Sequence, residues 1–157
     1  MSMIRGRIRL LATVALTTFA CGGGTEELGS SPLDAAARFP AVLAQDPCLV
    51  VMTDAVARWS GSEVRRLEAR LPTVDGGGQA RAGCVAFARE GGSDDPFFEV
   101  DMKRPADPAT DPPDAPREGV AFAVVEGTAF ELRCERCGDR TADALESIVT
   151  SYAALVE

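Results

Sequence analysis

The chain has 157 residues, a length that suits one domain with a single hydrophobic core, and it carries a formal net charge of −8. This excess of acidic residues argues against a nucleic-acid partner, because binding to phosphate backbones requires basic patches that displace counterions. The sequence contains no histidine, which excludes histidine-dependent nucleophiles and histidine-bearing zinc sites.

The first predicted element is a signal peptide at residues 1–21. Arg5, Arg7 and Arg9 form a basic region, and the apolar stretch that follows is shorter than the about 20 residues that cross a bilayer. It ends in Thr-Phe-Ala-Cys, which resembles the lipobox of bacterial lipoproteins and implies that Cys21 is lipidated. The alternative is an ordinary signal peptide with an incidental cysteine, which would give a soluble secreted protein.

Residues 22–31 are rich in glycine, serine and acids, a composition typical of a flexible tether, and residues 32–157 are predicted to form a single α+β domain. The resemblance to lipoproteins implies a lipid-anchored protein of the cell envelope. The anchoring membrane would be the outer membrane in a Gram-negative host and the outer face of the plasma membrane in a Gram-positive host. Gly22 stands where inner-membrane retention signals of such lipoproteins usually carry aspartate, which favours the outer membrane.

Short helices are predicted at the start of the domain. Ser31 can cap a helix that has Pro32 at its first position and continues over 33–38, and Pro40 interrupts it before a continuation over 41–45. The residue before a proline avoids helical angles, so the dipeptide 46–47 should end this region.

Thr53 is then predicted to cap a short helix that presents Val56 and Trp59 and ends at Gly61. Residues 63–71 are ambiguous, because Leu67 and Leu71 fit both helical spacing and one face of a strand. The glycine-rich turn that follows, and the apolar segment after it, favour a strand.

Further strands are predicted at 82–88 and 97–102, followed by a loop rich in proline and aspartate. The clearest hairpin joins 120–125 to 128–134 through a turn at residues 126–127. Its alternating apolar positions are Val120, Phe122 and Val124 on one strand and Phe130, Leu132 and Cys134 on the other.

The chain closes with a predicted helix capped by Thr141, with Asp143 favourably placed in its first turn. Its apolar face comprises Leu145, Ile148, Val149, Tyr152 and Leu155. The predicted fold is therefore α+β: an antiparallel sheet of about four or five strands, with N- and C-terminal helices packed on it.

With Cys21 assigned to the anchor, four cysteines remain, and an even number in an exported chain indicates disulfides. Of the three possible connectivities, Cys48 with Cys84 and Cys134 with Cys137 is favoured, because the last two are close by spacing alone. The other two connectivities stay open at this point.

The sharpest motif is Cys134-Glu135-Arg136-Cys137-Gly138, which has three interpretations. A redox centre would need a thiol of lowered pKa, which Arg133 and Arg136 could help to stabilise, but the helix is predicted to start only near Thr141. Half of a zinc site would need a second close pair of cysteines. A structural disulfide needs nothing more, and is the interpretation we favour.

Other candidate groups are acidic. Glu99 and Asp101 have the spacing of one strand face, where alternating polar positions explain them better than acid/base catalysis. Several aspartates could offer oxygen ligands to calcium, but their spacing does not match an EF-hand and their prolines indicate a solvated loop. These residues are Asp94, Asp95, Asp107, Asp111 and Asp114.

The segment Asp-Pro-Cys at 46–48, the helix near Thr53, Cys84 in a strand, and the late hairpin with its C-terminal helix weakly resemble exported lipoproteins of unknown function from actinobacteria. The resemblance implies fold and compartment, and no reaction. No cofactor or metal signature is present. We therefore expect an envelope-tethered, non-catalytic lipoprotein that either binds an unknown envelope protein or small ligand or has an accessory structural role. The alternative is a thiol–disulfide redox protein that uses Cys134 and Cys137.

Overall fold

The structure, a computed structural model, describes residues 31–90, 94–107 and 117–156, so the predicted signal peptide with Cys21 and nearly all of the tether lie outside it. In chain order its elements are α1 (Pro32–Ala36), α2 (Ala41–Gln45), the 3-10 helix η1 (Pro47–Val50), α3 (Thr53–Ser60), β1 (Val64–Val74), β2 (Ala80–Ala88), β3 (Phe98–Arg104), β4 (Val120–Val125), β5 (Thr128–Cys134), the 3-10 helix η2 (Gly138–Arg140) and α4 (Thr141–Val156).

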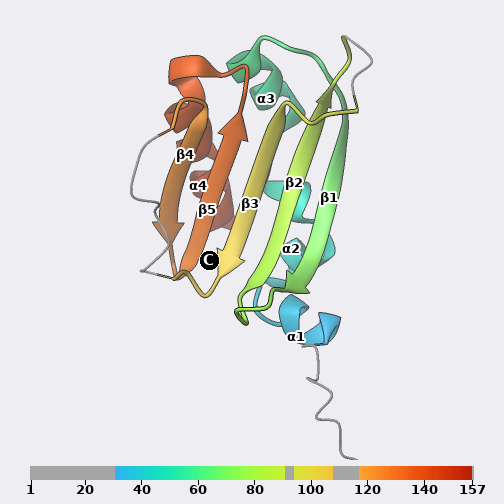
Figure 1. The fold of residues 1–157 in the computed structure, drawn as a ribbon, viewed down its shortest axis with the longest axis vertical. Helices are drawn as coiled ribbons and strands as arrows, with labels where there is room; N and C mark the ends of the chain where they lie inside the picture. Colours follow the sequence, from blue (N-terminus) through green and yellow to red (C-terminus); the bar gives the residue numbers. More distant parts are fainter. Residues whose placement is uncertain (1–30, 91–93, 108–116, 157) are drawn as a thin grey trace, which may run out of the picture.

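The five strands form one antiparallel sheet in the order β1-β2-β3-β5-β4 (Figure 1), which confirms the predicted α+β class. The β4–β5 hairpin coincides with the predicted ranges. Its register corrects one prediction: Ala121 and Ala123 lie opposite the core residues Leu132 and Phe130, so Val120, Phe122 and Val124 face away from the helices. Its two turn residues, Glu126 and Gly127, have φ values of 49° and 72°. Positive φ at both positions matches the twist of paired strands, so this turn suits a tight hairpin.

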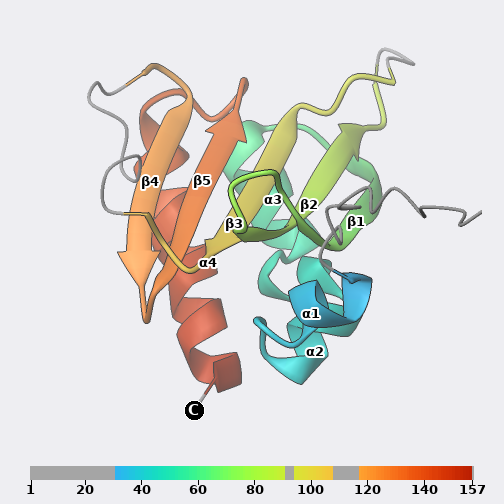
Figure 2. The same ribbon diagram turned by 60° about the horizontal axis from the view of Figure 1, so that its bottom comes forward.

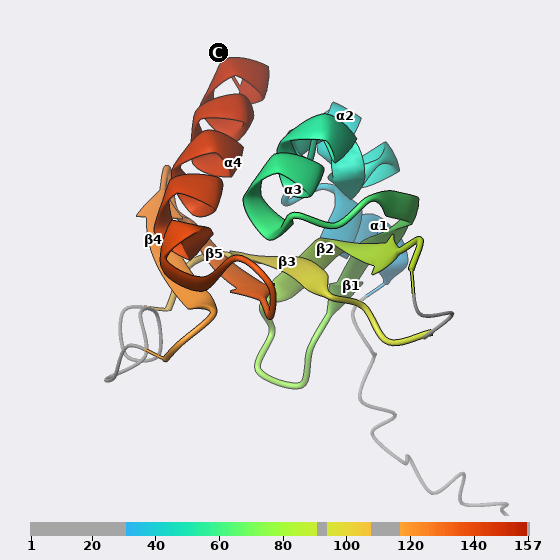
Figure 3. The ribbon, with the colours of Figure 1, turned by 90° about the horizontal axis from the view of Figure 1, so that it is seen from above.

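One face of the sheet is covered by helices, and no helix of the described residues covers the other face, as Figure 3 shows from above. On β3, Phe98, Val100 and Met102 face the helices and are fully buried, while the residues between them face the other side. Phe130, Leu132 and Cys134 continue the inward face on β5, because each lies opposite one of these three. Alternation along the strands therefore decides which residues form the core.

The helices begin and end close to the predicted residues, with two differences at their caps. Ser31 accepts a hydrogen bond from the backbone of Leu33, as expected. Thr53, however, is already helical, and the capping position falls on Met52 without a side-chain bond. Thr141 is helical too, and its hydroxyl donates to the Gly138 carbonyl at 2.7 Å. In this second case η2 leads directly into α4 and leaves no capping position to fill.

β1 extends three residues beyond its predicted end, and an irregularity near Pro72 changes which side chains face inward. The register with β2 shifts between Arg70 and Thr73. Leu67 packs on the core, as alternation predicts, but Leu71 is 58% exposed and Pro72 is buried in its place. An extra residue in one strand moves every later side chain to the opposite face, which explains the exposed leucine.

α4 covers the β4–β5 half of the sheet. Leu145, Ile148 and Tyr152 are buried as predicted, whereas Leu155, at the far end, is 39% exposed. Figure 3 shows why, since the C-terminal end of α4 lies farthest from the sheet. The phenol of Tyr152 is 2.8 Å from the Thr128 hydroxyl and accepts a hydrogen bond from Arg104 at 3.2 Å, so this buried polar group is satisfied.

Candidate functional site at the Cys134–Cys137 turn

Cys134 is the last residue of β5, and the chain turns back to bond it to Cys137 just before η2. The two Cα atoms are 5.4 Å apart. Gly138 has a φ of 58°, a left-handed conformation that glycine adopts without strain. Both cysteines belong to the core, with exposed fractions of 0% and 2%. The disulfide thus joins the end of a central strand to the start of the last helical segment.

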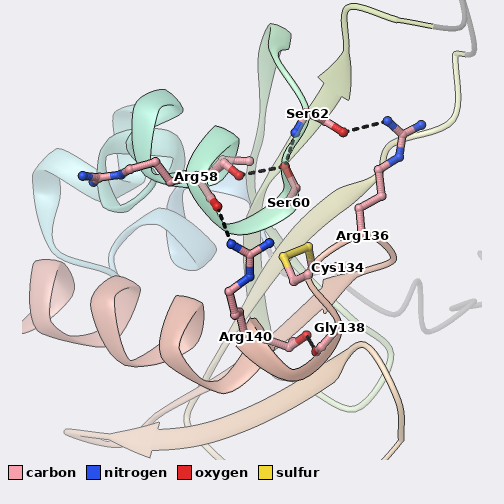
Figure 4. Close-up of a disulfide and its surroundings, with 10 residues drawn as sticks. Arg58, Ser60, Ser62, Cys134, Arg136, Gly138 and Arg140 are labelled. Carbon is pink, nitrogen blue, oxygen red and sulfur yellow. Dashed lines mark hydrogen bonds between the residues drawn. A yellow bond between two sulfur atoms is a disulfide. The ribbon is translucent and has the colours of Figure 1, made fainter.

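Two arginines next to this disulfide reach across to the C-terminal end of α3 and to the residues that follow it (Figure 4). Arg136 donates to the Ser62 hydroxyl at 2.8 Å and lies over the ring of Phe97. Arg140 donates to the backbone carbonyl of Arg58 at 2.8 Å, in the last turn of α3. Carbonyls at a helix C-terminus lack helical partners and attract cations, so Arg140 stabilises the end of α3.

The contacts of the neighbouring cations do not fit a site that stabilises a thiolate. Arg133 lies beside Cys134 in β5, so its side chain points to the opposite face of the sheet, where it binds Glu131 at 2.7 Å. The guanidinium of Arg136 is engaged with Ser62. The helix α4 starts only at Thr141, after both cysteines, so its N-terminus is not placed on Cys134 as in reactive Cys-x-x-Cys motifs.

Cys48 and Cys84 form the second disulfide, which confirms the favoured pairing. Their Cα atoms are 5.0 Å apart and 36 positions separate them in the sequence. Asp46 positions Cys48 by accepting a hydrogen bond from its backbone at 2.9 Å. The bond ties η1 to β2, and therefore the helical layer to the sheet. Since these thiols are bonded to each other, they do not form a zinc site with Cys134 and Cys137.

No cluster of three or more cysteine, aspartate or glutamate side chains suited to a metal ion occurs within residues 31–90, 94–107 and 117–156. Among the aspartates considered for calcium, Asp94 pairs with Arg65 at 3.2 Å. Asp111 and Asp114 lie outside the described residues.

Glu99 and Asp101 share the helix-free face of the sheet, as their spacing predicted. Arg70 of β1 forms an ion pair with Glu99 and lies 3.7 Å from Asp101. Burial, and then repulsion from Glu99, raise the pKa of Asp101 above its usual value. The two carboxylates are thus part of a network of surface ion pairs, which supports a structural interpretation.

Replacing Asp101 by asparagine is expected to raise the free energy of unfolding at neutral pH. Because the pKa of Asp101 is raised in the folded state, folding favours the neutral carboxyl. Its contribution to the free energy of unfolding is fully present below the unfolded pKa of about 3.9 and is lost as pH rises through the folded pKa. Asparagine is neutral throughout, so its advantage should shrink as pH falls towards 4. Urea titrations between about pH 3.5 and 7 measure this difference.

Asp94→Asn is the matched control, since its side chain is 87% exposed. It should change stability little at any pH, because exposed ion pairs contribute about 0–1 kcal/mol. A destabilising effect of Asp101→Asn at pH 7 would mean that its attraction to Arg70 outweighs burial and repulsion.

Sequence reasoning missed an apolar groove between β4 and α4, with a volume of about 270 Å³. Ala121 and Ala123 line it from the strand, and Leu145 and Val149 from the helix. Small residues alternating with larger ones along β4 are a sequence signal for such a groove. That signal becomes useful only when the position of α4 is known.

Within the described part of the chain, no helix combines the length and the apolar character needed to cross a membrane. Comparisons of the chain with protein-family models, with curated proteins and with solved structures found no match, so its function has to be inferred from its own residues and contacts.

Proposed function

We propose that this protein is a non-catalytic lipoprotein of the cell envelope, anchored through Cys21, whose folded domain binds another envelope component. The signal-like segment at residues 1–21 and the tether that follows support export and anchoring. The lack of histidine excludes histidine-dependent nucleophiles and acid/base groups, which narrows the catalytic chemistry open to the domain. The anchor would place the domain at a membrane surface, where it can hold a partner near that surface.

The observation that carries this proposal is the burial of both disulfides. Cys84 and Cys134 are fully buried, Cys137 is 2% exposed and Cys48 is 9% exposed. Disulfides persist in oxidising compartments and are rare in the cytosol. Two such bonds in one small core favour an exported protein in which the cysteines stabilise the fold.

The alternative function is that of a thiol–disulfide redox protein acting through Cys134 and Cys137. Exchange requires a thiolate of the partner to attack one of the two sulfurs in line, which in turn requires access. With exposed fractions of 0% and 2%, neither cysteine offers that access in the folded state. Their burial therefore favours a structural disulfide.

The reduction potential of each pair tests this choice. The purified protein is equilibrated in thiol buffers of known potential, free thiols are alkylated, and peptide mapping quantifies each pair separately. Both pairs are expected below about −300 mV, as is usual for structural disulfides. A Cys134–Cys137 potential between about −120 and −270 mV, the range of known oxidoreductases, would instead support the redox function.

A further inference from the structure

The outer edge of β4 offers backbone groups that pair with no other strand of the described residues. Apart from an isolated bridge between Val120 and Arg117, β4 pairs within those residues with β5 alone, and a two-residue turn closes this hairpin. The closing pair of such a hairpin is hydrogen-bonded, and bonded pairs then alternate with non-bonded ones. The backbone N–H and C=O groups of Phe122 and Val124 therefore point away from β5. The neighbouring Val120 fits this pattern, because its N–H donates to Arg117 at 3.1 Å instead of to β5.

The two edges of the sheet differ in how they are protected. Natural edge strands discourage further pairing with charged side chains, prolines or bulges. The edge strand β1 has all three, with four charged residues, a proline and a register shift. β4, by contrast, has no charged residue and no proline in its sequence Val-Ala-Phe-Ala-Val-Val. This edge therefore has the character of a strand that accepts a partner.

The groove beside β4 suits the side chains of an added strand. Ala121 and Ala123 face α4 yet stay half-buried, because α4 does not cover the edge of the sheet completely. A strand placed next to β4 would direct every second side chain towards this groove. Its lining is largely apolar, with Leu145 and Val149 on the helix, and its charged lining residue is Glu146.

The charges favour a basic occupant. Glu118 and Glu126 flank β4 and Glu146 borders the groove, which together outweigh Arg117, and the chain as a whole has a net charge of −8. A second copy of this chain would bring the same acids together. The chain's own segment 105–116 is also a poor occupant of this edge. It is acidic, and its five prolines lack the N–H groups needed for a ladder of backbone hydrogen bonds.

The location of this edge also fits a tethered protein. The described chain starts at α1, which packs near β1, and the sheet order puts β4 at the opposite edge. Figure 2 shows α1 and β4 on opposite sides of the molecule. A partner strand at β4 would therefore lie on the side of the domain opposite to the residue where the described chain begins.

We propose that β4 and the groove beside it bind an extended segment of another envelope protein as a sixth strand. Alternate side chains of this segment are apolar and its flanking residues are basic. Backbone hydrogen bonds to Phe122 and Val124 supply affinity, and the groove selects side chains, as in other cases of strand addition. This inference rests on the proposed binding function and specifies the partner's chemistry.

A capped peptide of about six residues, with alternating valines between lysines, is the probe. Fluorescence anisotropy with the purified, oxidised protein should show saturable binding, and hydrogen exchange should show new protection at Phe122 and Val124. Val124→Pro should weaken binding at least tenfold while leaving the melting temperature nearly unchanged, because the N–H it removes is not bonded to β5. Val124→Thr is the matched control and should bind like the wild type. Glu146→Gln should weaken binding severalfold.

A second comparison does not depend on any protein variant. The same peptide methylated at alternate backbone nitrogens cannot form the ladder and should not bind. Equal binding of both peptides, protection at β1 instead of β4, no binding at millimolar peptide, or self-association of the protein through β4 would each overturn the inference. None of these results bears on the lipidation of Cys21 or on the potential of Cys134–Cys137, so failure here is distinguishable from failure of the proposed function.

Discussion

Replacing Cys48 and Cys84 together by serine is expected to lower the melting temperature by roughly 10–20 °C. Their sequence separation is 36, against 3 for Cys134 and Cys137. In the chain-entropy model the longer loop contributes about 4 kcal/mol to stability and the shorter one about 2 kcal/mol. The longer link also joins η1 to β2, so its loss removes a tie between the two layers.

The double serine variant of Cys134 and Cys137 is the matched comparison, since it also places two hydroxyls in the core. Calorimetry under identical conditions should give the smaller decrease for this second variant. Peptide mapping of the non-reduced wild type provides an independent check on the pairing. An equal or larger loss on replacing Cys134 and Cys137 would show that contacts of the turn, such as those of Arg136 and Arg140, outweigh loop entropy.

Cys21→Ser is expected to move the protein from the membrane fraction to the soluble fraction almost completely. Cys21 lies outside the described residues, and its lipidation is our proposal from the resemblance of residues 18–21 to a lipobox. Each buried methylene of an acyl chain contributes about 0.8 kcal/mol to membrane binding, so several chains anchor a protein firmly. A net charge of −8 offers no compensating attraction to anionic lipids.

Membrane flotation and mass spectrometry of the N-terminal peptide measure this effect. Gly22→Ala is a suitable control, because it changes the adjacent residue and keeps the thiol. In a Gram-negative host the wild type should fractionate with the outer membrane. If the wild-type protein were soluble and its Cys21 unmodified, the lipoprotein proposal would be wrong. An ordinary secreted protein would then be the better interpretation.

Local signals predicted the elements well where they agreed with one another. The bounds of the hairpin formed by β4 and β5 were predicted to the residue, because two apolar runs flank a turn that glycine favours. The alternation on β4, however, marked the face away from the helices, because the core side of this strand carries Ala121 and Ala123. The disulfide pairing seen in the structure is the one that spacing favoured, although the sequence left the other two connectivities open. The tertiary order of the strands, with β5 between β3 and β4, did not follow from local pattern, because it depends on contacts distant in sequence.

The predictions that were wrong depended on backbone geometry or on contacts that a local sequence pattern does not contain. Leu71 was predicted on the same strand face as Leu67, but the register shift near Pro72 reverses the alternation there. Thr53 and Thr141 have the residue type of a helix cap, yet η2 continues into α4 and Thr53 lies one residue inside α3. The ion pair of Arg70 with Glu99 and the groove beside β4 both join residues far apart in the chain, so neither could be found by local reasoning.

The two disulfides connect each cysteine of the folded domain to its nearest neighbour in the sequence, Cys48 to Cys84 and Cys134 to Cys137. A chain that emerges from a secretion channel N-terminus first exposes the first pair completely before either thiol of the second has appeared. Oxidation in order of emergence then produces the native bonds directly. If the domain is exported as we propose, its biogenesis would therefore need an oxidant but no isomerase to rearrange mispaired cysteines.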